Sequence, residues 1–253
     1  MSFEEYAADG ALVLGGAAAI LLQLGDPVVA RGVARHSGFA RDPMRRLRGT
    51  LSYVYAVGLG SAQQARLAAA IVDGAHTRVP GATDVHRQLW VAATLHRVGV
   101  TVHEELNGPL DPAVADEIYA AGARLGTMLQ VPRGAWPADR AAFEAYWTDA
   151  IAALEIGDEA RGVARDVLHS RAIPWWTQPA MPLIRVLTSG LLPVSVREAY
   201  GLPHHPARYR AAIGFVRVLR RLTPRRLREL PSRRLLARLV PREGAGSKPA
   251  GSD

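Results

Sequence analysis

Apolar residues recur along this chain at the three- and four-residue spacing of amphipathic helices, and no stretch sustains the polar–apolar alternation of a strand. An aspartate before proline marks a helix start, because the carboxylate caps the helix and proline suits its first position. Starts of this or a similar kind stand at Asp26–Pro27, Asp42–Pro43, Ser61, Asp111–Pro112, Asp139 and Thr223–Pro224. The pattern predicts an all-α protein with a long amphipathic helix over residues 84–106.

One apolar run, residues 10–25, lies between Asp9 and Asp26. It contains 16 uncharged residues, whereas a bilayer-spanning helix needs roughly 20. We therefore interpret the run as a buried core helix. The acidic start of the chain lacks the basic region of a secretory signal, so we expect a cytoplasmic protein, with membrane association as the alternative.

The composition is that of a globular protein, with 49% hydrophobic and 21% charged residues among 253. Cysteine is absent, which excludes disulfides, thiolate nucleophiles and metal–thiolate centres. We expect one helical domain over residues 1–240. Residues 241–253 are poor in apolar side chains and are predicted to be a disordered tail.

The net charge of +8 is concentrated near the C-terminal end. Residues 207–243 hold twelve arginines against two glutamates, whereas residues 1–206 hold 18 arginines against 20 acids. A nucleic-acid-binding domain usually spreads basic charge over its folded surface, so we expect no nucleic-acid partner. Arginines beside apolar residues over 208–238 would suit peripheral contact with an anionic membrane, although a solvated helix face is the interpretation we favour.

His76 ends an alanine-rich helix in the stretch "DGAHTRVPG", residues 73–81. On a helical wheel it faces inward, away from a polar face made by Gln63, Arg66, Asp73 and Thr77. Its face also carries Ala65, Ala68, Ala69, Val72, Ala75 and Val79. The residues alone favour a structural histidine. They also permit an axial haem ligand, because neutral imidazole binds iron and small neighbours admit a flat macrocycle.

Five blocks of sequence, in order, carry a family resemblance: "GGAAAILLQLGDPVVARGVARHSGF", "DPMRRLRGT", "GAHTRVPG", "LWVAATL" and "GLLPVSVREAYGLP". Together they resemble the family of the bacterial rubber oxygenase (latex-clearing protein) catalytic domain, which also includes the fungal oxygenase of the mycophenolic acid pathway. The similarity runs from about residue 14 to 231. It implies a single multi-helix orthogonal bundle that binds b-type haem.

The resemblance also implies the site residues. The family's proximal iron ligand corresponds to His76, and its haem-side arginine and threonine correspond to Arg46 and Thr50 in "RLRGT". An arginine can pair with a haem propionate or polarise a distal ligand, and a threonine hydroxyl can hydrogen-bond to either. Arg46 and Thr50 are thus the expected catalytic and cofactor-binding residues, together with His76 as the metal ligand.

The chain departs from the family pattern at three positions. Gly49 stands where some rubber-cleaving members have a distal lysine, and Thr83 stands where an aromatic residue is usual. Ala92 replaces a histidine that many members carry, and His96, one turn later, is a candidate substitute.

These observations favour a haem b-dependent oxygenase that acts on a small hydrophobic substrate with O₂. In this hypothesis an apolar pocket formed by the helices over residues 10–25 and 86–100 receives the substrate. The alternatives are a non-catalytic helical binding protein with a degenerate haem site, and a basic helical protein that binds an anionic membrane or nucleic acid through its C-terminal arginines. His103, Glu104 and Glu105 would suit a metal site, but we give them little weight because they end a helix.

Overall fold

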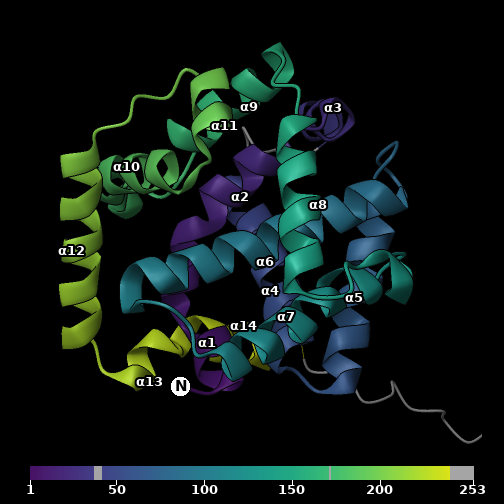
Figure 1. Cartoon of the computed structure of the whole chain (residues 1–253), viewed down its shortest axis with the longest axis horizontal. Helices are drawn as coiled ribbons and strands as arrows, with labels where there is room; N and C mark the ends of the chain where they lie inside the picture. Colours follow the sequence, from purple (N-terminus) through teal and green to yellow (C-terminus); the bar gives the residue numbers. More distant parts are fainter. Residues whose placement is uncertain (37–41, 171, 240–253) are drawn as a thin grey trace, which may run out of the picture.

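The computed structural model describes residues 1–36, 42–170 and 172–239, which form α-helices and short 3₁₀ helices without a strand (Figure 1). The prediction of an all-α protein is confirmed. In chain order the elements are α1 (Phe3–Ala8), η1 (Gly10–Gly15), α2 (Gly16–Gln23), α3 (Pro27–His36), α4 (Pro43–Leu59), α5 (Ala62–His76), α6 (Val85–Asn107), α7 (Pro112–Thr127), η2 (Arg133–Ala135), α8 (Arg140–Ala152), α9 (Asp158–Leu168), η3 (Trp175–Ala180), α10 (Met181–Leu191), α11 (Val194–Ala199), α12 (Pro206–Leu222), α13 (Arg225–Arg228) and α14 (Leu230–Arg238).

Five of the six predicted helix starts are made by capping side chains, and the exception is Thr223–Pro224. The Asp26 carboxylate accepts hydrogen bonds from the backbone N–H groups of Val28, at 2.7 Å, and Val29, at 3.0 Å, at the start of α3. At the start of α5, Ser61 and Gln64 form a reciprocal capping box. Each cap satisfies N–H groups that have no partner inside the helix, which is why the sequence located these starts well.

The apolar run over residues 10–25 is buried as expected, but it is not one α-helix. It begins as the 3₁₀ helix η1 and continues as α2, and the two meet where Gly15 lies against α6. A Cβ atom on Gly15 would lie 2.4 Å from Val98 Cγ1, so glycine permits the close approach of the two elements. Among the described residues, no single helix has the length and apolar composition to span a bilayer. Gly10–Gln23 and Pro27–Arg35 meet that test only as a pair, which is bent by 111°.

The long helix α6 is at the centre of the molecule, and α8 and α12 cross its direction steeply (Figure 1). Its Trp90 indole donates a hydrogen bond to the carbonyl of Leu22 at 3.2 Å. The Tyr200 hydroxyl donates to the carbonyl of Leu21 at 2.7 Å, which ties the end of α11 to the same buried helix α2. These bonds and the surrounding aliphatic side chains form the main core.

Helices α4 and α5 form a hairpin joined by Gly60 and Ser61. Small residues on both helices, including Ala56 and Ala68, form the contact between them. Helix α14 closes one side of the hairpin, where the Gln64 side chain donates to the carbonyl of Leu236 at 3.0 Å. The hairpin positions all three predicted site residues.

The C-terminal basic region is helical after the predicted start at Thr223–Pro224. It forms two helices, α13 and α14, with a break at Glu229. Pro231 explains the break, because its ring would clash with a carbonyl of the preceding turn if the helix were continuous. The expected tail, residues 241–253, lies outside the described residues.

Candidate functional site

The α4–α5 hairpin brings His76 and Arg46 together. His76 is the last residue of α5, and Arg46 lies in the first turn of α4. Because the two helices fold back on each other at residues 60–61, these positions are nearly equidistant from the turn. The charge of Arg46 acts on the His76 ring and helps to lower its pKa.

The imidazole of His76 is half-buried and uncharged near neutral pH. Burial is the main cause that lowers its pKa below the ordinary value, and Arg46 adds to the effect while Asp73 opposes it. The Nδ1 atom is buried and has no hydrogen-bond partner among the described residues. A neutral imidazole keeps a nitrogen lone pair available, which is the form that binds a metal.

Arg46 and Thr50 are four residues apart on α4 and therefore share one face of that helix. Both are exposed. Protein atoms around the Arg46 guanidinium desolvate it and lower its pKa. The guanidinium stays charged nonetheless, because the ordinary pKa of arginine lies far above neutral pH. The structure thus brings Arg46 to His76, whereas it places Thr50 only by its position on the same helix.

The wheel for α5 is correct in its middle and wrong at its end. Ala65, Ala68 and Ala69 are buried as predicted, but Ala75 is exposed. The last turn of α5 lies opposite the beginning of α4, at the open end of the hairpin, so fewer elements cover it. His76 therefore lies on a partly open surface.

A polar chain behind the site was not predicted. The Asp73 carboxylate, one turn before His76, accepts a hydrogen bond from the Gln130 side chain at 2.8 Å. The backbone N–H of Gln130 donates in turn to the buried Gln88 side chain at 2.9 Å. No motif in the sequence links these three positions, which come from α5, α6 and the segment after α7. These hydrogen bonds fix the end of α5 to α6.

The residues around His76 fit a histidine-ligated haem in their chemistry. The imidazole is neutral, its Nδ1 atom lacks a partner among the described residues, and the positive charge of Arg46 acts on the ring. A Cβ atom added at Gly49 or at Gly74 would meet nothing within 4 Å, so both helices leave space on their surfaces here.

Ala92 and His96 lie on the part of α6 that packs into an aromatic cluster. Ala92 is buried in a cluster with Val131 and the aromatic residues of α7 and α8. The His96 ring contacts the rings of Tyr119, Trp136 and Phe143, with ring centres 5.2–5.9 Å apart. Burial lowers the pKa of His96 to about 4. These contacts support a structural role for His96 and give no support to its proposed substitution for the missing histidine.

Residues 10–25 and 86–100 pack closely against each other where the substrate pocket was expected. The hollow near them, lined by residues such as Leu14, Val102 and Leu187, measures about 10 Å³. That volume is too small for an organic substrate. The apolar side chains that suggested a pocket instead fill the core.

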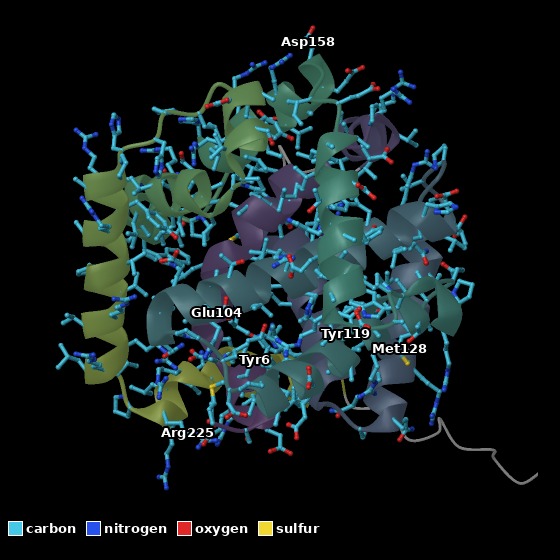
Figure 2. The ribbon with its side chains drawn as sticks, viewed as in Figure 1. Tyr6, Glu104, Tyr119, Met128, Asp158 and Arg225 are labelled. Carbon is cyan, nitrogen blue, oxygen red and sulfur yellow. The ribbon has the colours of Figure 1, made fainter. Side chains whose placement is uncertain are left out.

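The cluster at the end of α6 is also structural. The His103 ring lies against Tyr6 at a tilt of 60°, with ring centres 5.4 Å apart, and its Nδ1 atom accepts a hydrogen bond from the Asn107 side-chain amide at 3.1 Å. Figure 2 shows Tyr6 close to Glu104. Within the described part of the chain, no group of three or more histidine and acidic side chains is arranged to hold a metal ion.

The fold and the site thus define an all-α protein whose candidate site contains one neutral histidine near an arginine. The chain belongs to the family described as "ER-bound oxygenase mpaB/B'/Rubber oxygenase, catalytic domain", whose model matches residues 4–224. The family is thus that of an oxygenase catalytic domain, as the resemblance implied.

Two mycobacterial proteins are similar to the chain over most of their length. They are the uncharacterized proteins Mb2261 of Mycobacterium bovis and Rv2237 of Mycobacterium tuberculosis. Each is 36% identical over 227 residues, which cover 83% of this chain and 89% of the relative. No solved structure gives a significant match.

Proposed function

We propose that the protein is a haem b-dependent oxygenase that acts on a hydrophobic organic substrate with O₂. One observation carries the proposal: a neutral, half-buried histidine lies beside an arginine at the open end of the α4–α5 hairpin, in a chain of an oxygenase catalytic-domain family. The hydrophobic substrate rests on the family description, which names a rubber oxygenase, since rubber is a hydrocarbon.

Each of the three residues has a distinct role in this proposal. His76 would bind the iron through a ring nitrogen, because burial keeps its imidazole uncharged. Arg46 would pair with a haem propionate, and the Thr50 hydroxyl would donate a hydrogen bond on the same side of α4. When bound, haem supplies a site at which O₂ is activated for transfer to the substrate.

Titration with haem tests the cofactor. The wild-type chain is expected to give a sharpened, shifted Soret band that saturates at one equivalent, and His76→Ala is expected to lose it. His169→Ala is the matched control, because His169 is an exposed histidine at the end of α9. A wild-type protein whose spectrum remains that of free haem, or a His76→Ala variant that binds like wild type, would overturn the proposal.

The role of Arg46 can be separated from that of His76 with a modified cofactor. Arg46→Leu is expected to weaken haem binding by about ten- to one-hundred-fold, the effect of losing a charge-assisted hydrogen bond. The same variant should bind the dimethyl ester of haem as well as wild type does, because the ester has no propionate charge. Arg45→Leu is the control, since Arg45 is exposed and its Nε atom lies 3.9 Å from Oδ2 of Asp42.

The exposure of Arg46 and Thr50 favours a second candidate, a helical binding protein with a degenerate haem site. One side of the site is open in this arrangement, whereas oxygenase chemistry needs a shielded one. A protein of this kind would bind haem weakly and would not consume O₂ when reduced. Oxygen uptake by the haem-loaded, reduced protein therefore distinguishes the two.

A further inference from the structure

We propose that the outward face of α12, together with α13, docks on an anionic lipid bilayer. This inference is independent of the haem site and concerns the opposite side of the molecule. In Figure 1, α12 lies along one edge and α5 lies toward the other.

Helix α12 is apolar on two faces, and only one of them is covered. Ala212, Ile213 and Val216 are buried in the main core. The outward face carries Phe215, Val218, Leu219 and Leu222, at the three-, four- and seven-residue spacing of one helix stripe. These four side chains are between 52% and 76% exposed, and Leu227 on α13 is 54% exposed. A continuous row of large exposed apolar side chains marks an interaction surface.

Apart from Arg217, which donates hydrogen bonds to the backbone carbonyl of Glu105, the arginines of α12 and α13 divide into two groups. Arg220, Arg225 and Arg228 are held by acidic residues of the protein itself. The second group is exposed and forms no ion pair within the described residues; it comprises Arg208, Arg210, Arg221 and Arg226. Arg210 and Arg221 lie eleven residues apart, so they follow the same edge of the apolar row. This edge attracts anions.

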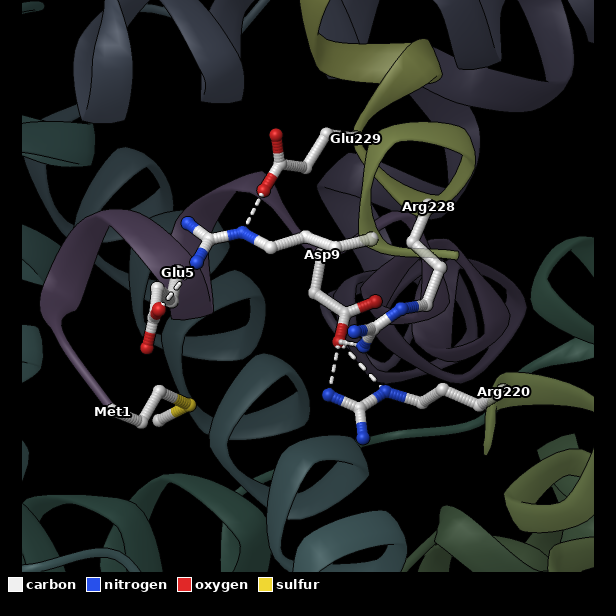
Figure 3. Close-up of a pocket in the computed structure, with 7 residues that line it drawn as sticks. Met1, Glu5, Asp9, Arg220, Arg228 and Glu229 are labelled. Carbon is white, nitrogen blue, oxygen red and sulfur yellow. Dashed lines mark hydrogen bonds and ion pairs between the residues drawn. The ribbon is translucent and has the colours of Figure 1, made fainter. Parts of the chain in front are cut away.

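The first group of arginines fixes the helices in place. Arg220 contacts the buried carboxylate of Asp9 at 2.6 Å, and Arg228 contacts the same oxygen at 3.4 Å (Figure 3). Arg225 pairs with Glu5 and with Glu229. These pairs surround a hollow of about 130 Å³ and tie α12, α13 and the start of α14 to α1. The outward face is therefore preformed and does not need to be ordered by a partner.

The combination of an apolar row and a cationic edge matches a bilayer better than other partners. An amphipathic helix lies at the lipid interface with its apolar side chains among the acyl chains and its arginines at anionic headgroups. A nucleic acid would engage the arginines but would leave the row of Phe215 and Leu222 unused. A second copy of the chain would cover the row but would bring unpaired arginines of both copies close together.

Co-sedimentation of the full chain with vesicles tests this inference. Phosphatidylserine–phosphatidylcholine vesicles should retain the protein at low salt, pure phosphatidylcholine vesicles should retain much less, and added salt should weaken retention. The double variant Phe215→Ser/Leu222→Ser should reduce binding at least about tenfold. Arg221→Glu should reduce it more than about fivefold, because one basic residue near the surface contributes about that factor.

The matched controls are Ile71→Ser and Arg66→Glu on α5, which change an exposed apolar residue and an exposed arginine away from α12. Both should bind vesicles as wild type does. Three results would each overturn the inference: no retention by anionic vesicles at low salt, retention unchanged by the Phe215/Leu222 variant while duplex DNA competes for the protein, or a dimer in solution that this variant converts to monomer.

Discussion

The carboxylate of Asp9 joins the N-terminal and C-terminal helices, and its replacement should lower the stability of the fold. The Asp9 side chain is only 6% exposed, and it contacts both Arg220 and Arg228. Its Oδ1 atom also accepts a hydrogen bond from the backbone N–H of Ala11 at 3.0 Å and so caps η1. Asp9→Asn removes the charge and retains the cap, whereas Asp9→Ala removes both.

The size of each effect follows from these contacts. Breaking a buried ion pair by removing one partner costs about 3–5 kcal/mol. Arg220 and Arg228 are 23% and 26% exposed, so water compensates them in part. We therefore expect Asp9→Asn to lower the free energy of unfolding by about 2–3 kcal/mol. Asp9→Ala should cost about 1 kcal/mol more, because the cap is also lost.

Differential scanning calorimetry measures these effects. A loss of 1 kcal/mol shifts the melting temperature of a chain of this size by about 2–4 °C, so Asp9→Asn should melt roughly 4–12 °C below wild type. Asp158→Asn is the control, since Asp158 lies at the rim of the molecule with a fully exposed side chain, 3.4 Å from Arg161 (Figure 2). It should melt within about 2 °C of wild type.

Equal melting temperatures for Asp9→Asn and Asp158→Asn would refute this reasoning, because burial would then make no difference to the ion pair. A single cooperative transition in wild type is also what the prediction of one domain over residues 1–240 requires.

Three further changes have expected outcomes. Gly190→Ala should lower the free energy of unfolding by about 1–3 kcal/mol in urea, because its Cβ would lie 2.0 Å from the Tyr209 ring; an unchanged midpoint would show that α10 and α12 are not in close contact. Ser61→Ala should cost about 1 kcal/mol through loss of the α5 cap, measured in the same way, and no loss would contradict the capping box. Burial lowers the pKa of His96 from its ordinary value of 6.5 to about 4. As the pH falls from 6.5 to 4, the unfolded chain therefore binds the proton before the folded chain does, and the free energy of unfolding falls by about 3 kcal/mol at most. In His96→Phe, the free energy of unfolding measured in urea should depend less on pH over this range. An unchanged pH dependence would contradict the burial of the ring.

The helix starts were predictable because they depend on local chemistry. Asp26, Asp42 and Ser61 each cap the helix that follows them, and none of these bonds requires a distant residue. The break between η1 and α2 was not predictable, since it depends on how closely Gly15 approaches Val98 across the core. Local signals thus locate the elements, whereas tertiary contacts decide where one element changes into another.

The candidate site shows the same division. Periodicity predicts that His76 faces inward, whereas the ring is only half-buried at the open end of the hairpin. The proximity of His76 to Arg46 follows from the short connection at Gly60–Ser61 once both segments are helical. The hydrogen bond between Gln130 and Asp73 joins residues far apart in sequence, and no sequence pattern predicts it. The sequence places arginines beside apolar residues over 208–238, but it did not show that one apolar face of α12 stays uncovered, because periodicity shows that a helix has apolar faces and not which of them another helix covers.

The central claim is that the His76 imidazole binds the haem iron, and rescue of a cavity variant tests it most directly. His76→Gly removes the ring and leaves room for free imidazole at the end of α5. With haem and imidazole added, His76→Gly should recover the Soret band and the axial-nitrogen signature of wild type, whereas His169→Gly should have the wild-type spectrum without imidazole. A His76→Gly spectrum that equals wild type before imidazole is added, or that does not change afterwards, would contradict the claim.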